Sequence, residues 1–265
     1  MLAWPPQPMD PVQLEPIDEA VVSFIGDVHG WWSRLEDLLP QCQGHLVFVG
    51  DLIDRGSQSR EVVQAVRALV EEGRASVIMG NHEYALVRGL GCPDIGIPGN
   101  DELYEAWWSR YGGATTAHSY GADPQDPQAL RRALGDDLAF LAELPWYLWG
   151  RAGDQPWLAV HAGLEERPYA QQLHECSRQY RWLRTELPRF LYAKDRVHTR
   201  PSDLPTECAL VSGHTPQPEA SITAGRILTD TSGGRFQRRL SAVIWPSGEV
   251  VQSQDDGSRR IERLW

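Results

Sequence analysis

The sequence predicts an α/β fold, in which strands alternate with helices before a second half that is rich in strands. Three successive segments, 20–42, 45–73 and 75–90, each begin with a short apolar run, continue through a glycine-centred polar turn and end with helical spacing. Strand-like runs return between residues 146 and 252. This alternation is typical of βαβ units, whose sheet is covered by helices on both faces.

The predicted strands are short runs rich in Val, Ile and Phe that lead into turns. In the first half they begin the segments 20–30, 45–56 and 75–83, and a helical pattern follows each. The turns 223–225 and 246–248 predict hairpins, because Gly and Pro favour tight turns. In the second half the runs occupy residues 146–150, 157–164, 209–216, 226–232 and 240–253.

Residues 91–145 interrupt the alternation and predict a helical insertion. The stretches 102–113 and 126–145 both space their apolar residues as helices do. The predicted organisation is therefore a flexible extension at 1–20, one domain at 21–252 and a solvated tail at 253–265.

The composition is that of a globular protein without a disulfide framework. Hydrophobic residues make up 42% of the 265 residues, enough to bury a substantial core. The cysteines are scattered and match no metal motif, so we expect free thiols in a reducing compartment. The N-terminal segment lacks the pattern of a secretory signal, and no stretch is long and apolar enough to span a bilayer. These features predict a cytoplasmic protein without a membrane partner.

The charge balance excludes several classes of function. A formal net charge of −11 argues against broad nucleic-acid binding, which draws its energy from surface cations that neutralise phosphates. Lys194 is the only lysine, which disfavours Schiff-base chemistry. No glycine-rich loop precedes a Lys-Ser or Lys-Thr pair, so a P-loop is not expected. Any anionic substrate must be bound by local positive charge.

Polar side chains with metal-binding chemistry follow the predicted strands. They are Asp27, His29, Asp51, Asp54, Arg55, Asn81, His82, Glu83, His161 and His214. Because α/β sheets place ligands at the carboxyl ends of strands, we expect these turns to converge. Oxygen and nitrogen donors without Cys favour Mn²⁺, Fe²⁺ or Zn²⁺. The set exceeds the needs of one ion, and two ions about 3.5–4 Å apart that share a carboxylate would suit displacement at phosphorus.

Five motifs carry a resemblance to a known family. GDVHG (26–30), GDLIDRG (50–56), GNHE (80–83), VHAGL (160–164) and SGHTP (212–216) resemble, in order and spacing, the phosphoprotein phosphatase family of calcineurin-like metallophosphoesterases. Arg55 after Asp54, and Glu83 after His82, resemble the phosphoprotein phosphatase branch of that superfamily. The stretches 111–121, 138–145 and 230–243 are similar to its bacterial type.

The resemblance implies an α/β/β/α sandwich with a helical insertion and a centre for two divalent metal ions. Mn²⁺ is the first expectation, with Fe and Zn as alternatives. Asp27 and His29 would bind one ion, and Asp51 would bridge both. Asn81, His161 and His214 would bind the other ion. A hydroxide that bridges the two ions would attack phosphorus.

The resemblance also implies roles for side chains around the ions. His82 would protonate the leaving oxygen, and Asp54 would hold His82 in its tautomer and orientation. Arg55 would bind phosphate oxygens, together with Asn81 and an arginine of the later half, for which Arg184 is the candidate.

The function implied first is hydrolysis of phosphomonoesters by a bacterial serine/threonine protein phosphatase. A symmetrical dinucleoside polyphosphate hydrolase is the alternative, because enzymes of that kind share these motifs. A third interpretation is an inactive binding module on the same fold. The expected partner is a phosphorylated protein or a small phosphorylated molecule. The sequence leaves open the oligomeric state and the roles of Trp31, Trp32 and the segment 186–207.

Overall fold

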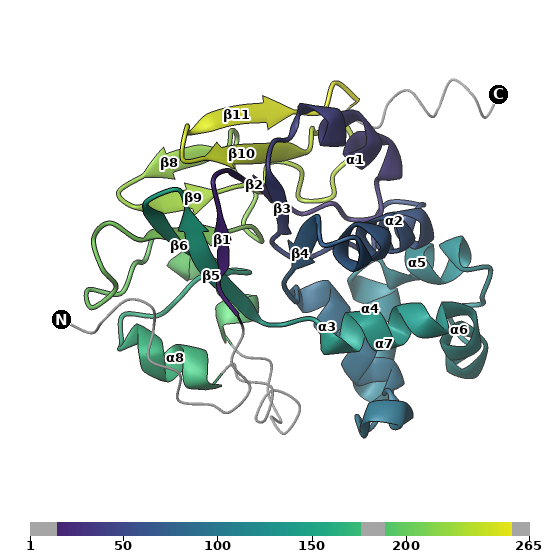
Figure 1. The fold of residues 1–265 in the computed structure, drawn as a ribbon. Helices are drawn as coiled ribbons and strands as arrows, with labels where there is room; N and C mark the ends of the chain where they lie inside the picture. Colours follow the sequence, from purple (N-terminus) through teal and green to yellow (C-terminus); the bar gives the residue numbers. More distant parts are fainter. Residues whose placement is uncertain (1–14, 176–188, 256–265) are drawn as a thin grey trace.

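Two β-sheets form the centre of the computed structural model, which describes residues 15–175 and 189–255 (Figure 1). The six-stranded sheet contains, in spatial order, β1 (Ile17–Glu19), β5 (Tyr147–Ala152), β6 (Gln155–Val160), β7 (Ala209–Ser212), β9 (Arg226–Leu228) and β8 (Ser221–Thr223). The five-stranded sheet contains β11 (Glu249–Gln252), β10 (Ser241–Trp245), β2 (Val22–Ile25), β3 (His45–Phe48) and β4 (Ala75–Val77).

Helices pack on the outer faces of both sheets, with α1 to α7 gathered on one side and α8 on the other (Figure 1). They are α1 (Trp32–Leu38), α2 (Ser59–Glu71), α3 (Asn81–Leu90), α4 (Asp101–Arg110), α5 (Gly113–Ser119), α6 (Pro127–Leu134), α7 (Asp136–Glu143) and α8 (Tyr169–Glu175). Short 3₁₀ turns are η1 (Leu39–Gln41), η2 (Pro93–Ile95), η3 (Arg189–Leu191) and η4 (Lys194–Arg196). Within the described residues, no helix is both long and apolar enough to cross a membrane.

The alternation of side chains along the central strands explains the layers. In β2, Phe24 packs between the sheets, where its ring meets Trp157 edge-on at 5.2 Å, while Ile25 belongs to the cluster beneath the helices. In β3, Val47 and Phe48 divide in the same way. A strand that is apolar on both faces needs cover on both sides. The α/β/β/α sandwich implied by the family resemblance is confirmed.

The strand directions place several carboxyl ends together. β2, β3 and β4 run parallel, as the three strand–turn–helix units predict, and β10 runs antiparallel to β2. In the other sheet β6, β7 and β9 run parallel. Both predicted hairpins are present, as β8–β9 and β10–β11. The parallel strands therefore deliver the turns that follow them to shared edges.

The helical insertion between residues 91 and 145 contains α4 to α7. The structure divides the helical pattern of residues 126–145 into α6 and α7. The division falls at Gly135, whose φ of +51° lies in the left-handed region that glycine adopts readily. α4 packs on α3 and α5 packs on α2, so the insertion covers the helices that follow β3 and β4.

Both predicted ends of the domain need correction. Residues 17–19 were expected in a flexible extension but form β1, which pairs with β5 because Gly150 leaves room for the backbone of Ile17. Residues 253–255 were expected in a solvated tail, yet Ser253 is fully buried and its N–H donates to the carbonyl of Leu240 at 2.9 Å. Residues 1–14 and 256–265 lie outside the described part of the chain.

Candidate active site

The predicted site residues follow strands whose carboxyl ends converge. β2 leads to Asp27 and His29; β3 to Asp51, Asp54 and Arg55; β4 to Asn81 and His82; β6 to His161; and β7 to His214. Two glycines allow the close approach of these turns. A Cβ atom on Gly80 would collide with the carboxylate of Asp51, and one on Gly213 would collide with that of Asp27. A larger residue at either glycine would displace a carboxylate of the cluster.

The turns of the site hold their residues in unusual backbone conformations. Seven non-glycine residues of the described chain have positive φ, and five of them belong to the site: His29, Asp51, Asp54, Arg55 and His214, with φ between +50° and +75°. Such conformations cost about 1–3 kcal/mol each and persist only where the surroundings fix them. Because five of these strained residues lie in the site, the surrounding fold holds their side chains in position at a cost in local backbone energy.

Asp51 stands at the centre of the cluster and is almost fully buried. Its Oδ2 lies 3.7 Å from His29 Nε2 and 3.8 Å from His82 Nε2, and its Oδ1 lies 3.4 Å from His161 Nε2. Two groups of possible ligand atoms, each within 4.8 Å of one another, share this aspartate. They are His29, Asp51 and His82, and Asp51, His161 and His214. A carboxylate that belongs to both ligand groups would allow Asp51 to bind two neighbouring cations.

Asp27 and Asn81 complete the two groups. Asp27 Oδ2 lies 4.0 Å from His29 Nε2, beside the first group. Asn81 Oδ1 lies 3.0 Å from His161 Nε2, beside the second group. The structure thus brings together all six residues expected to bind metal: Asp27, His29, Asp51, Asn81, His161 and His214.

The imidazoles are oriented as metal-binding histidines are. His29 Nδ1 lies 3.0 Å from the carbonyl oxygen of Ile53, and His161 Nδ1 lies 2.7 Å from that of Val49. A carbonyl oxygen only accepts, so each Nδ1 carries a proton, and Nε2 is the ring nitrogen that faces the cluster and would bind an ion there. His214 is turned the other way, with Nε2 donating to the carbonyl of Tyr192 at 2.9 Å. A carbonyl partner of this kind fixes the tautomer of a metal ligand.

The electrostatics of the cluster also fit bound cations. Burial, with the charges of Asp230 and Asp51, raises the pKa of Asp27 well above its usual range. Burial alone would lower the pKa of His161, but Asp51 and Asp27 raise it to about 10. Burial and nearby Asp51 raise the pKa of Asp230 to about 6. In Asp27, His161 and Asp230 the raised pKa values favour protons that offset buried negative charge, and divalent cations would offset that charge instead.

His82 and Asp54 form a buried pair next to this cluster. His82 Nδ1 donates to Asp54 Oδ2 at 2.7 Å. Two further donors from the helical insertion reach the same carboxylate: Trp107 Nε1 at 2.9 Å from Oδ2, and the Thr116 hydroxyl at 2.7 Å from Oδ1. Burial opposes protonation of His82, but Asp51 and Asp54 raise its pKa above the usual value. The arrangement is that of an oriented imidazole that can deliver a proton.

Glu83 organises the turn that carries Asp51. Its Oε2 accepts from the backbone N–H groups of Asp51 at 2.8 Å and Gly80 at 3.0 Å, and its Oε1 accepts from those of Leu52 at 2.8 Å and Ile53 at 3.2 Å. Burial and the charge of Asp51 raise the pKa of Glu83 to about 7, while the amide donors favour the carboxylate. No role followed from the sequence for this residue, although it belongs to the GNHE motif.

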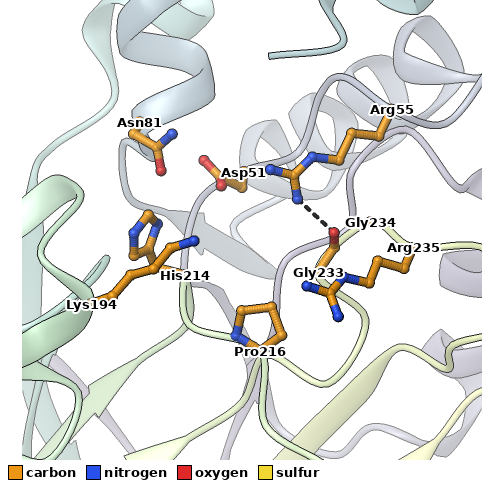
Figure 2. Close-up of a pocket in the computed structure, with 9 residues that line it drawn as sticks. All are labelled: Asp51, Arg55, Asn81, Lys194, His214, Pro216, Gly233, Gly234 and Arg235. Atoms are coloured by element: carbon orange, nitrogen blue, oxygen red, sulfur yellow. Dashed lines mark hydrogen bonds between the residues drawn. The ribbon is translucent and has the colours of Figure 1, made fainter. Parts of the chain in front are cut away.

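A pocket of 270 Å³ opens in front of the cluster (Figure 2). Asp51, Asn81 and His214 line its inner side. Arg55 reaches in from the β3 turn, with Nη1 donating to His29 Nε2 at 2.8 Å and to the carbonyl of Gly233 at 2.5 Å. Its Nη2 lies 3.1 Å from His82 Nε2. The guanidinium therefore faces the space where an anionic group next to these imidazoles would sit.

Several residues at or near the site were not found from the sequence. Trp107 and Thr116 bind Asp54 across 53 and 62 residues, and no local pattern of the sequence assigns them that role. Lys194 and Arg235 line the pocket but lie outside the motifs of the predicted ligands. Arg184, the candidate second phosphate-binding arginine, lies outside the described residues.

Comparison with known proteins places this fold in a known family. A family model described as calcineurin-like phosphoesterase matches residues 21–245, and the chain belongs to this family of hydrolases. The family implies divalent metal ions, and the His and Asp groups described above are candidates to bind them.

The relatives carry more specific names. Proteins named asymmetrical bis(5'-nucleosyl)-tetraphosphatase PrpE, from Geobacillus sp. (strain WCH70) and Anoxybacillus flavithermus, are 28% and 36% identical; each match covers 87% of this chain, and 92% and 93% of the relatives. A symmetrical bis(5'-nucleosyl)-tetraphosphatase of Janthinobacterium is 41% identical, over 26% of each chain. A serine/threonine phosphatase structure from Saccharomyces cerevisiae shares the fold, with TM-score 0.57 at 15% identity over 89% of this chain and 80% of that chain.

Proposed function

We propose that this protein is a metal-dependent hydrolase of bis(5'-nucleosyl) tetraphosphates. The observation that carries the proposal is the match of tetraphosphatase relatives over 92% and 93% of their length. The sequence ranked a bacterial serine/threonine protein phosphatase first and a symmetrical dinucleoside polyphosphate hydrolase second. The relatives favour the second class, and the full-length ones are named asymmetrical. We therefore place asymmetrical cleavage first and the protein phosphatase behind it.

The proposed roles of the site residues follow the geometry. Asp27, His29 and Asp51 would hold one divalent ion. Asp51 would hold a second ion with Asn81, His161 and His214. Bound ions of this kind supply Lewis-acid polarisation of the phosphoryl group and a lowered pKa for the attacking water. The donor set of His, Asp and Asn suits Mn²⁺, which we place first, and also Fe or Zn.

The remaining roles belong to the chain itself. His82, oriented by Asp54, would donate its Nε2 proton to the leaving oxygen of the broken phosphoanhydride. Arg55 faces the same space as His82 and His29. We infer that its guanidinium turns onto the oxygens of the reacting phosphate when substrate binds. Asn81 would contact the same phosphate from the opposite side of Asp51 (Figure 2).

The predicted setting of the enzyme is the reducing cytoplasm. Within the described residues, Cys42, Cys92 and Cys208 are free thiols, which supports this prediction. The net charge of −11 supports a small phosphorylated substrate rather than a nucleic acid.

The test is a comparison of substrates with identification of the products. The purified protein with Mn²⁺ is expected to hydrolyse diadenosine tetraphosphate with a kcat/KM at least about tenfold above that for a phosphoserine or phosphothreonine peptide. Ion-exchange chromatography then separates the outcomes, because asymmetrical cleavage gives ATP and AMP whereas symmetrical cleavage gives only ADP. Faster turnover of the phosphopeptides would restore the protein phosphatase. Activity that persists in the Asp51→Asn variant, or in the presence of a chelator, would remove the metal mechanism.

A further inference from the structure

The pocket mouth carries two cations that the proposed roles leave unused. Lys194 in η4 and Arg235 in the loop after β9 stand on opposite sides of the pocket, with Pro216 between them (Figure 2). The Lys194 ammonium group projects toward His214 and the space in front of Asp51 (Figure 2). Both residues are exposed. The pocket therefore has positive charge from these two residues in addition to that of Arg55, which contacts His29 and His82.

Neither of these cations is compensated by a carboxylate of the described chain. Arg189 and Arg196, which flank Lys194 in the same segment, both pair with Asp195, at 3.0 and 3.3 Å. Across residues 15–175 and 189–255, no ion pair involves Lys194 or Arg235. In a protein of net charge −11, positive groups without a partner at a pocket mouth are available for an anionic ligand.

The segments that carry both cations are tied to the site. The carbonyl of Tyr192, two residues before Lys194, accepts from His214 Nε2 at 2.9 Å. In the other segment, three consecutive carbonyls are held by side chains near the pocket. The carbonyl of Gly233 accepts from Arg55 at 2.5 Å, that of Gly234 from Trp31 at 3.2 Å, and that of Arg235 from Arg34 at 3.0 Å. The backbone at Arg235 is thus fixed relative to Arg55.

We propose that Lys194 and Arg235 bind the phosphates of a polyphosphate chain that lie beyond the phosphate under attack. In the proposed function, Arg55 and the metal ions held by the six predicted ligands already bind one phosphate, the one under attack. A phosphopeptide brings no further phosphate next to that one, whereas a polyphosphate chain adds a negative charge with every phosphate. Two cations on either side of the mouth match such a chain. This inference rests on the proposed function, since it assigns the substrate class at the same site.

The test measures selectivity rather than activity alone. In Lys194→Gln and Arg235→Gln, the ratio of kcat/KM for diadenosine tetraphosphate to that for p-nitrophenyl phosphate is expected to fall about three- to tenfold each, the range for ionic hydrogen bonds that solvent weakens. Lys194→Arg should keep most of the ratio. Arg196→Gln is the matched control, because it removes one charge from the same turn, and its ratio should equal that of the wild type. An unchanged ratio in both pocket variants would overturn the inference.

A binding measurement separates failure of this inference from failure of the proposed function. Calorimetry with inorganic tripolyphosphate and with inorganic phosphate, at a fixed excess of free Mn²⁺, needs no turnover. Lys194→Gln and Arg235→Gln should weaken tripolyphosphate binding more than phosphate binding. If diadenosine tetraphosphate is not hydrolysed but this difference is found, the proposed function fails and the polyphosphate site stands. Equal loss for both ligands would show that the two cations serve the reacting phosphate, and the inference would be wrong.

Discussion

Glu83→Gln provides the most direct test of how the fold holds Asp51 in place. Each carboxylate oxygen of Glu83 accepts two backbone N–H groups, at 2.8–3.2 Å, and the side chain is fully buried. A glutamine keeps one acceptor oxygen but turns an NH₂ group toward two N–H donors. Two buried donors then lose their partner at about 1–3 kcal/mol each, so the free energy of unfolding should fall by about 2–6 kcal/mol.

The assay is urea unfolding at pH 8, above the pKa of about 7 that burial and Asp51 give Glu83, so that the wild-type carboxylate is ionised. With a slope of about 3 kcal/mol/M, the midpoint should shift by about 0.7–2 M. Glu61→Gln is the control, since this exposed residue in α2 should change stability by no more than about 0.5 kcal/mol. If the free energy of unfolding of Glu83→Gln differs from that of the wild type by no more than this control value, the four hydrogen bonds do not contribute the assigned energy and the reasoning is wrong.

Three further predictions follow from the site and from two of the cysteines. Asp54→Asn replaces the charged acceptor of His82 Nδ1 with a neutral amide that has only one acceptor oxygen for three donors. It should lower kcat about 10²–10⁴-fold for phenyl phosphate but less for p-nitrophenyl phosphate, whose leaving group needs no proton. Equal losses in steady-state kinetics would exclude His82 as the acid. Removal of metal by a chelator should abolish activity. Mn²⁺ at about 100 times its dissociation constant should raise the melting temperature by about 5–10 °C. Calorimetry that finds no shift in the melting temperature would contradict the metal assignment. Burial raises the pKa of Cys42 and Cys208 to about 12, which keeps both as neutral thiols at pH 8. Mass spectrometry should therefore find fully buried Cys208 unlabelled by iodoacetamide in the folded protein, half-buried Cys42 labelled only slowly, and both labelled after unfolding. Rapid labelling of Cys208 in the folded state would refute its burial.

The sequence could predict the cluster of candidate metal ligands around Asp51 because each of these residues follows a strand closely. Asp27 comes two residues after β2, and His161 directly follows β6. Strand runs and the glycine turns behind them are local patterns, and parallel strands bring their ends together. The same local reasoning gave Trp31 only an open role, whereas the structure joins its indole to the carbonyl of Gly234, 203 residues away.

The partners of the proton-donating pair could not be predicted in this way. Trp107 and Thr116 lie in the helical insertion, where their spacing indicates buried helix faces and nothing more. Packing of α4 on α3 and of α5 on α2 brings their donors to Asp54. Likewise, nothing around Lys194 in the sequence separates it from a surface lysine, since only the course of the chain near His214 places it at the pocket.

The sequence by itself determined the alternation of strands and helices, the polar turns at strand ends and hence the donor set of the cluster. These features are local, because side-chain periodicity and turn chemistry act over a few residues. The tertiary structure alone decided which four backbone N–H groups donate to Glu83 and which donors reach buried Asp54. It also decided that residues 17–19 form an edge strand and that Lys194 lies opposite Arg235. The physical reason is that these contacts join segments far apart in the chain, and which ones meet depends on how the two sheets and the helical insertion pack.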